Sequence, residues 1–180
     1  MNKTISITVD VEEWFHTEWF NVEKIINTYY DGKYPKTDVV DCVKNLIELF
    51  DRYAVNATFF VLGETIERYP NLIHIIKNHN HEIACHSYYH NKKYGDIESF
   101  KEDIKKFKKD IYSDAMGFRF PNYKTSNELF KIIKVEEFSY DSSIVPCRKI
   151  PGWYGGSNFP INPFFYKLPV NLSHHPLDFE

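Results

Sequence analysis

The sequence predicts an α/β fold built on a parallel sheet or barrel. Short apolar or alternating segments, typical of strands, alternate along the chain with segments whose apolar residues recur at helical spacing. This alternation indicates βα units, because parallel strands need a crossover segment between them. The 180 residues suit a single domain over residues 1–180, large enough to bury a core without disulfide bonds.

The first half of the chain contains three predicted strands. Residues 5–9 alternate between apolar and polar side chains, which indicates a strand close to the N-terminus. Residues 17–37 are aromatic and polar, with Gly32 and Pro35 as breakers, so we expect a long loop there. The remaining predictions are a helix over 39–50, a buried strand over 57–62, helices over 64–69 and 70–78, and a strand over 82–85.

The second half continues the same alternation and then changes character. Asp96 is a plausible N-cap for a helix that continues to residue 111. A strand over 116–120, a helix over 126–134 and a strand over 138–141 follow. Proline and glycine crowd the segment after residue 145, which predicts a long loop, with a last strand over 165–170.

Composition excludes several classes of protein. With 22 Lys and Arg against 25 Asp and Glu, the chain lacks the basic excess of a general nucleic-acid binder. No segment approaches the ~20 apolar residues of a membrane span, and the N-terminus lacks the apolar run of a signal peptide. Cys42, Cys85 and Cys147 have no metal-ligand spacing and do not form a disulfide framework. We therefore expect a cytoplasmic protein with no nucleic-acid partner and no membrane span, whose oligomeric state stays open.

An acidic cluster follows the first predicted strand. Side chains two residues apart in a strand point the same way, so Asp10 and Glu12 share a face and Glu13 points away from it. Two carboxylates on one face can divide the work of a base and a metal ligand. The alternative is a solvated acidic turn.

Two histidines follow the third predicted strand. His86 and His90 lie four residues apart, so they can bind one metal ion if the segment turns helically. Such a pair also occurs on many surface helices, which makes it weak evidence alone. Four other histidines, which we expect at the surface or in local caps, are His16, His74, His79 and His81.

Two further polar clusters follow later strands. Arg119, one of four arginines, stands between two phenylalanines at a strand end. A semi-buried guanidinium needs a carboxylate partner, for which Asp10 is a candidate; the alternative is a purely structural ion pair. Asp141 follows the last of these strands, where it could equally form an Asx turn.

The order and spacing of these clusters resemble those of the polysaccharide deacetylase family, the carbohydrate esterases with a NodB-homology domain. Residues 86–90 match its H-S/T-x-x-H motif, and residues 119–123 match its R-x-P-x-Y motif. Residues 10–15, Asp-Val-Glu-Glu-Trp-Phe, are similar to a branch that reads D-V-E-D/E-W-F, as is Tyr-Asp-Ser-Ser at 140–143. The resemblance covers residues 4–145 and implies a distorted (β/α) barrel of the NodB-homology type, here one that stops early at its C-terminus.

The resemblance implies a mononuclear metal centre. Glu12, His86 and His90 would hold one divalent ion, with zinc as the first choice and cobalt, nickel or iron as alternatives. The ion would activate a water molecule for attack on an acetamide carbonyl. Ser87 would fix the histidine loop by hydrogen bonding.

The resemblance also implies catalytic roles. Asp10 would be the general base, Arg119 would keep it ionised and oriented, and the backbone N–H of Tyr123 would stabilise the oxyanion. Protonation of the leaving amine would fall to His174 or His175, with Asp141 as the orienting carboxylate, or to a residue beyond Glu180.

The substrate implied by the resemblance is an N-acetylated hexosamine in a glycan or a glycan precursor. Trp14, Tyr89 and Trp153 are candidates for stacking on its sugar rings. Two alternatives remain. One is a C–N hydrolase of a non-sugar amide or a cyclic ureide on the same scaffold, and the other is a glycan-binding pseudoenzyme that lacks the general acid.

Overall fold

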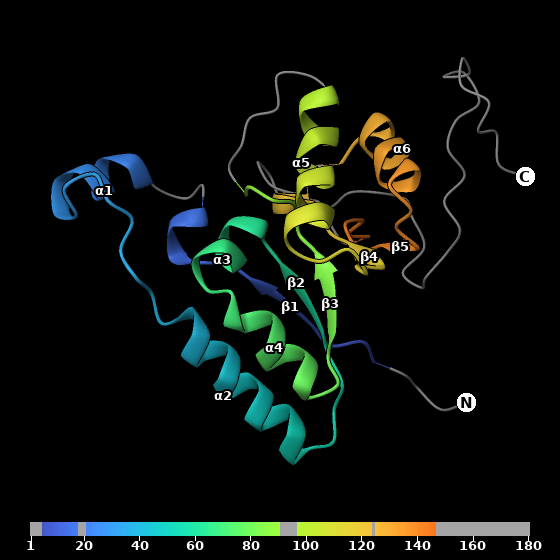
Figure 1. Ribbon diagram of the computed structural model, residues 1–180, viewed down its shortest axis with the longest axis horizontal. Helices are drawn as coiled ribbons and strands as arrows, with labels where there is room; N and C mark the ends of the chain where they lie inside the picture. The colour runs from blue at the N-terminus through green and yellow to red at the C-terminus, as the bar shows by residue number, and fades with distance from the viewer. Residues whose placement is uncertain (1–4, 18–20, 91–96, 124, 147–180) are drawn as a thin grey trace, which may run out of the picture.

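The computed structural model describes residues 5–17, 21–90, 97–123 and 125–146. Its strands form one parallel sheet in the order β1-β2-β3-β4-β5, with helices between consecutive strands (Figure 1). The strands are β1 Thr8–Val11, β2 Thr58–Val61, β3 Glu82–Cys85, β4 Gly117–Phe118 and β5 Tyr140–Asp141. Parallel strands in sequential order are the arrangement of a (β/α) barrel, and they confirm the predicted α/β fold.

The helices lie where the apolar spacing predicted them, with one exception. They are α1 Val22–Tyr29, α2 Val39–Arg52, α3 Gly63–Arg68, α4 Asn71–Asn78, α5 Ile97–Asp110 and α6 Asn127–Val135. Two single-turn 3-10 helices, η1 Trp14–His16 and η2 Pro121–Tyr123, follow β1 and β4. Within the described ranges, no helix combines the length and the apolar character needed to cross a membrane. The strand predicted over 165–170 lies outside the described residues.

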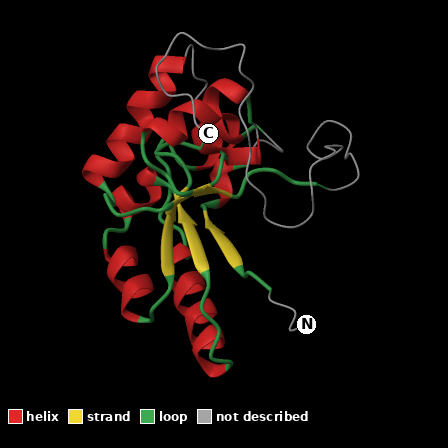
Figure 2. Cartoon of the chain, turned by 90° about the vertical axis from the view of Figure 1, so that its right-hand side faces the viewer, coloured by secondary structure: helices red, strands yellow, loops and turns green. Residues whose placement is uncertain are grey.

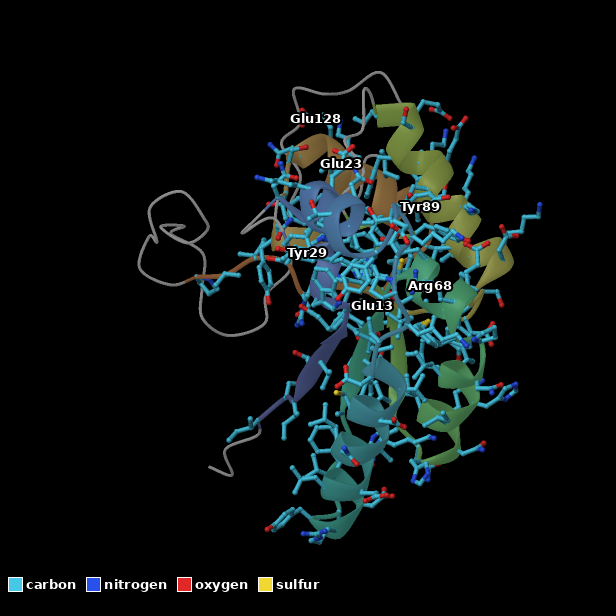
Figure 3. The ribbon with its side chains drawn as sticks, turned by 90° about the vertical axis from the view of Figure 1, so that its left-hand side faces the viewer. Glu13, Glu23, Tyr29, Arg68, Tyr89 and Glu128 are labelled. Atoms are coloured by element: carbon cyan, nitrogen blue, oxygen red, sulfur yellow. The ribbon has the colours of Figure 1, made fainter. Side chains whose placement is uncertain are left out.

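Helix α1 is the exception, because it corrects the prediction of a long loop over 17–37. The side chain of Asn21 caps the helix by accepting the backbone N–H of Lys24 at 2.9 Å. Ile26 is its buried residue, whereas Tyr29 at its end stays largely exposed (Figure 3). The breakers that suggested a loop follow the helix rather than interrupt it.

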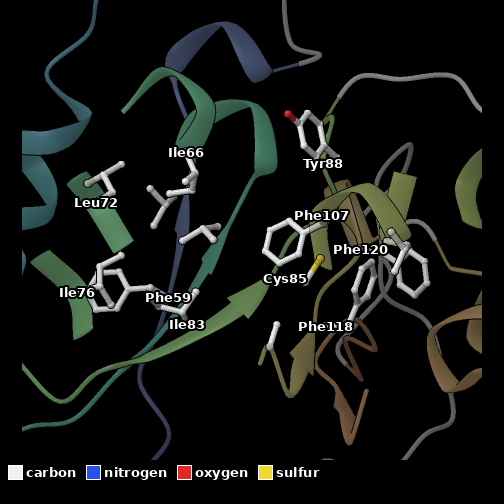
Figure 4. Packing of buried hydrophobic residues seen from close by; sticks show 14 of the residues in the cluster. Phe59, Ile66, Leu72, Ile76, Ile83, Cys85, Tyr88, Phe107, Phe118 and Phe120 are labelled. Carbon is white, nitrogen blue, oxygen red and sulfur yellow. The ribbon is translucent and has the colours of Figure 1, made fainter. Parts of the chain in front are cut away.

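The sheet has two faces with different chemistry. All strands run in one direction, so their carboxyl ends meet at one edge (Figure 2). One face packs into the main apolar core, together with residues of α2, α4 and α5 (Figure 4). Its buried strand residues are Val11, Phe59, Val61, Ile83, Cys85 and Phe118. The alternate positions belong to the other face, which carries Asp10 and, just past β1, Glu12.

Candidate functional site

Three potential metal ligands converge at the carboxyl edge of the sheet. Glu12 follows β1, and His86 and His90 follow β3. Glu12 Oε1 lies 2.7 Å from His86 Nε2 and 3.3 Å from His90 Nε2. One ligand atom from each residue lies within 4.8 Å of the other two. The two imidazoles are buried and the carboxylate is half-buried, so the predicted ligand set comes together in space.

The hydrogen bonds of His86 show what this cluster can hold. Its Nδ1 lies 2.7 Å from the carbonyl oxygen of Arg119, and a carbonyl only accepts, so Nδ1 carries the hydrogen. Neutral His86 then directs the lone pair of Nε2 at the carboxylate of Glu12. Two acceptors 2.7 Å apart need a proton or a cation between them. A carboxylate with two imidazoles is a donor set that zinc and related ions accept, so the residues fit a divalent metal ion.

Glu12 is ionised in this setting. Burial raises the pKa of Glu12, but when the two imidazoles are protonated, the hydrogen bonds and charges of His86 and His90 lower it by more and leave it well below its usual range. Glu12 therefore offers an ionised carboxylate to a cation, which would take the place of the protons on the two imidazoles.

The loop from His86 to His90 is not helical. We had expected that the two histidines could bind one metal ion only if this segment formed a helical turn, and the structure corrects that expectation. Ser87 has a φ of 70°, in the left-handed region. Its carbonyl oxygen accepts the backbone N–H of Gly63, at the start of α3, at 3.1 Å. A Cβ atom on Gly63 would collide with the ring of Tyr88, so only glycine allows this contact. The loop is thus held by its backbone against α3.

The hydroxyl of Ser87, predicted to fix this loop, makes no such contact within the described residues, and its role stays a prediction. It is buried and has no hydrogen-bond partner in the described part of the chain. The backbone of Ser87 makes the contact instead.

The expected pairing of Arg119 with Asp10 is present. Arg119 Nη1 donates to Asp10 Oδ1 at 2.6 Å. Nη2 donates to Thr8 Oγ1 at 3.0 Å and to Ser142 Oγ at 2.7 Å, and Nε donates to the Ser142 carbonyl at 3.2 Å. The guanidinium carbon lies 4.0 Å from the ring centroid of Phe60. These hydrogen bonds fix the position of the Arg119 side chain. Arg119 in turn holds Asp10, which lies two residues before Glu12 on the same strand face.

Comparison with known proteins identifies the family. The sequence model of the polysaccharide deacetylase family matches residues 20–139. This chain belongs to the polysaccharide deacetylase family. A peptidoglycan-N-acetylglucosamine deacetylase of Bacillus cereus is 31% identical over 90 residues, which are 45% of this chain and 32% of that protein. A second such deacetylase of Bacillus cereus is 30% identical over 119 residues, 63% of this chain and 54% of that protein.

This member of the deacetylase family spans only part of its relatives. The chain covers about a third to about half of the length of these two proteins. A family 4 carbohydrate esterase from Streptomyces lividans, solved in complex with acetate, matches with a TM-score of 0.55 and 16% identity. That match covers 80% of this chain and 62% of the esterase. At this identity the likeness shows the fold alone, and it agrees with the NodB-homology type of fold.

The family-implied oxyanion donor is engaged elsewhere. The backbone N–H of Tyr123 donates to the carbonyl of Phe120 at 3.0 Å, within η2. Tyr123 has a φ of 54°, so its backbone is in the left-handed region. A substrate oxygen would have to share this N–H or replace the Phe120 carbonyl, and the oxyanion role stays a prediction.

Asp141 forms the Asx turn that we kept as its alternative. Its Oδ1 accepts the backbone N–H of Ser143 at 2.9 Å, and its Oδ2 accepts the Ser143 hydroxyl at 2.6 Å. Burial raises the pKa of Asp141 to about 6, against the hydrogen bonds from Ser143 and the charge of Arg119. Ser142, which sequence reasoning missed, is the residue of this segment that contacts Arg119. His174 and His175, the predicted partners of Asp141, lie outside the described residues.

Two of the three predicted sugar-stacking residues, Trp14 and Tyr89, lie in the described part of the chain. Trp14 is 37% exposed, and its ring lies 5.5 Å from that of Phe15 and 6.2 Å from that of Tyr30, between centroids. The Tyr89 hydroxyl accepts a hydrogen bond from Lys106 Nζ at 3.0 Å. Trp153 lies outside the described residues, and the binding role of all three stays a prediction.

Glu13 points away from the metal-ligand cluster, as the strand alternation predicted. Its buried Oε1 accepts the hydroxyls of Thr37 at 3.0 Å and Tyr69 at 3.2 Å. Arg68 Nε lies 3.4 Å from its Oε2 (Figure 3). Glu13 therefore ties η1 to the end of α3.

Sequence reasoning missed two residues beside the cluster, His16 and Glu64. His16 is only 3% exposed, so the prediction of a surface position is wrong, whereas that of a local cap is confirmed. Its Nδ1 accepts the backbone N–H of Glu13 at 3.0 Å, and burial lowers its pKa to about 3. Glu64 lies in the first turn of α3, and its position directly after β2 was the available signal.

Proposed function

We propose that this protein is a metal-dependent hydrolase that removes N-acetyl groups from acetamido sugars in a polysaccharide or a glycan precursor. The observation that carries the proposal is the convergence of Glu12, His86 and His90 next to the Asp10–Arg119 pair. The two Bacillus cereus relatives are named as peptidoglycan-N-acetylglucosamine deacetylases, so we expect N-acetylglucosamine in a glycan as the first substrate to test.

In this proposal, Glu12, His86 and His90 hold one divalent ion, with zinc first and cobalt, nickel or iron as alternatives. When bound, the ion supplies Lewis acidity, which polarises the acetyl carbonyl and eases the ionisation of water. The Arg119 carbonyl supports this arrangement, because it occupies the Nδ1 hydrogen of His86 and leaves Nε2 as the ligand atom.

Asp10 is the general base of this proposal, which accepts a proton from the attacking water. The hydrogen bond from Arg119 to one oxygen of Asp10 orients the side chain and leaves the other oxygen for that proton. The backbone N–H of Tyr123 would donate to the oxyanion, which would either share this N–H with the Phe120 carbonyl or replace that carbonyl.

The remaining roles are proposals that rest on the family resemblance. His174 or His175 would protonate the leaving amine. Trp14, Tyr89 and Trp153 would stack on sugar rings, whose apolar faces match aromatic side chains.

The test is acetate release from short chitooligosaccharides by purified protein supplied with zinc or cobalt. The Asp10→Asn variant should lose activity by about 10²–10⁴-fold while its metal content stays unchanged, because it loses the base and not a ligand. Asp41→Asn, an exposed carboxylate on α2, is the matched control and should keep full activity. Survival of activity in Asp10→Asn would exclude Asp10 as the base, and failure of the folded protein to take up metal would exclude the ligand assignment.

The same assay separates the alternatives. Sugar binding without acetate release indicates a glycan-binding pseudoenzyme. Hydrolysis of a cyclic ureide or a non-sugar amide, with no action on acetamido sugars, indicates a different C–N hydrolase on this scaffold.

A further inference from the structure

His16 and Glu64 contact His90 in a way that the proposed reaction does not use. Glu64 Oε1 accepts the backbone N–H of His90 at 2.9 Å and lies 3.3 Å from His16 Nε2. The rings of His16 and His90 stack, with centroids 5.7 Å apart and planes 19° from parallel. One carboxylate oxygen and one imidazole ring therefore hold both the backbone and the ring of the same candidate ligand.

The cap of η1 fixes the orientation of His16. Its Nδ1 accepts the backbone N–H of Glu13 at 3.0 Å, so the hydrogen of the neutral ring is on Nε2. The ring of Phe15 lies 4.8 Å from that of His16, nearly edge-on, and His16 is buried. With the ring fixed in this way, its Nε2 lies 3.3 Å from Glu64 Oε1, the same oxygen that accepts the N–H of His90, although this contact does not meet hydrogen-bond geometry within the described residues.

These contacts join three segments that follow three different strands of the sheet. His16 belongs to η1 after β1, Glu64 to α3 after β2, and His90 to the loop after β3. His86, by contrast, is oriented from β4 through the carbonyl of Arg119. The two histidine ligands of the proposed centre are thus held by different elements, and Glu64 holds the backbone of His90.

We infer that Glu64 is a positioning residue for the proposed metal centre and that His16 supports it. The pair keeps His90 Nε2 at 3.3 Å from Glu12 Oε1 and so determines how tightly the centre retains its metal. Removal of a group that orients a metal ligand typically costs 10–100-fold in metal affinity. The inference rests on the metal centre of the proposed function, and it adds two residues that the family motifs do not include.

The test measures zinc affinity and zinc release with a chromophoric chelator, which needs no substrate. Glu64→Met keeps the length of the side chain but removes the acceptor, so affinity should fall about 10–100-fold. Glu64→Gln keeps an oxygen for the His90 N–H and should restore most of the affinity. Glu67→Met is the matched control, because Glu67 is on the same helix and accepts the Tyr88 hydroxyl at 3.0 Å rather than a group of a ligand.

A second variant keeps the inference testable if Glu64→Met does not fold. His16→Phe keeps a ring over His90 and removes both nitrogens, so zinc should be released faster than from the wild type. Wild-type affinity and release in both Glu64→Met and His16→Phe would overturn the inference, as would an equal loss in Glu67→Met. If the wild-type protein itself binds no zinc, the proposed metal centre fails instead, and the two failures are therefore distinguishable.

Discussion

The backbone carbonyl of Arg119 accepts the Nδ1 hydrogen of His86 at 2.7 Å, while the guanidinium of the same residue donates to Asp10. A single residue at the end of β4 therefore orients a candidate metal ligand with its main chain and the candidate base with its side chain. The ligand set and the base consequently share one rigid support, and a change at Arg119 acts on both.

Metal binding should stabilise the protein measurably, because the pairing of His86 Nε2 with the Glu12 carboxylate leaves two acceptors in need of a cation. Zinc at 100 times its dissociation constant adds about 2.7 kcal/mol to the free energy of unfolding. For a chain of this size that corresponds to a rise in Tm of about 5–10 °C, which thermal denaturation with zinc and with a chelator would measure. His86→Asn should abolish the rise, and the exposed His74→Asn should keep it. An equal rise in His86→Asn would place the zinc elsewhere.

Replacement of Arg119 by lysine should be far from conservative. Arg119 distributes its hydrogen bonds over Asp10, Thr8 and Ser142, and a single ammonium cannot reproduce this planar arrangement. We expect kcat to fall by about 10²-fold or more and the free energy of unfolding to fall by about 1–3 kcal/mol. Deacetylation kinetics and urea denaturation measure the two effects. Arg52→Lys, on an exposed residue of α2, serves as the control, and equal behaviour of the two variants would contradict this reading of Arg119.

The helices and the strand faces that the sequence predicted correctly depend on local periodicity. Strand alternation placed Asp10 and Glu12 on one face and Glu13 on the other, and the structure agrees. The Asp10–Arg119 pair was also predictable, because a buried guanidinium needs an anion and the carboxyl ends of parallel strands lie together. Helix α1 was missed because the breakers after Tyr29 indicated a loop and the cap at Asn21 was not recognised.

The features that the sequence did not predict depend on contacts between distant segments. The course of the loop from His86 to His90 is set by Gly63, which is required by the Tyr88 ring and not by any neighbour in sequence. His16 and Glu64 look like an ordinary cap and an ordinary first-turn carboxylate. Only the meeting of η1, α3 and the histidine loop at one edge of the sheet gives them a place beside the metal-ligand cluster.

Replacement of Ser87 by glycine should stabilise the protein and leave the metal centre intact. The φ of 70° strains any non-glycine residue by about 1 kcal/mol or more, and the buried hydroxyl has no partner among the described residues. The added freedom of glycine in the unfolded chain offsets part of this gain, so we expect a net stabilisation of about 1 kcal/mol. Urea denaturation and zinc titration measure the result. Loss of zinc affinity or activity in both Ser87→Gly and Ser87→Ala would instead assign the hydroxyl the supporting role implied by the family.

The free energy of unfolding should carry a pH dependence that comes from Asp141. Burial raises the pKa of Asp141 from 3.8 to about 6, so between these values the folded protein binds more protons than the unfolded chain. Stability from this group is therefore present below about pH 4 and declines as the pH rises through 6, by at most about 3 kcal/mol. Asp141→Asn removes the titration, so the stability difference between variant and wild type should shift in favour of the variant from pH 4.5 to pH 7.5. The control is Asp114→Asn, an exposed carboxylate that also accepts a serine hydroxyl, at 2.9 Å, and its difference from the wild type should stay constant. Parallel curves for Asp141→Asn and the wild type would show that the buried carboxylate keeps its ordinary pKa.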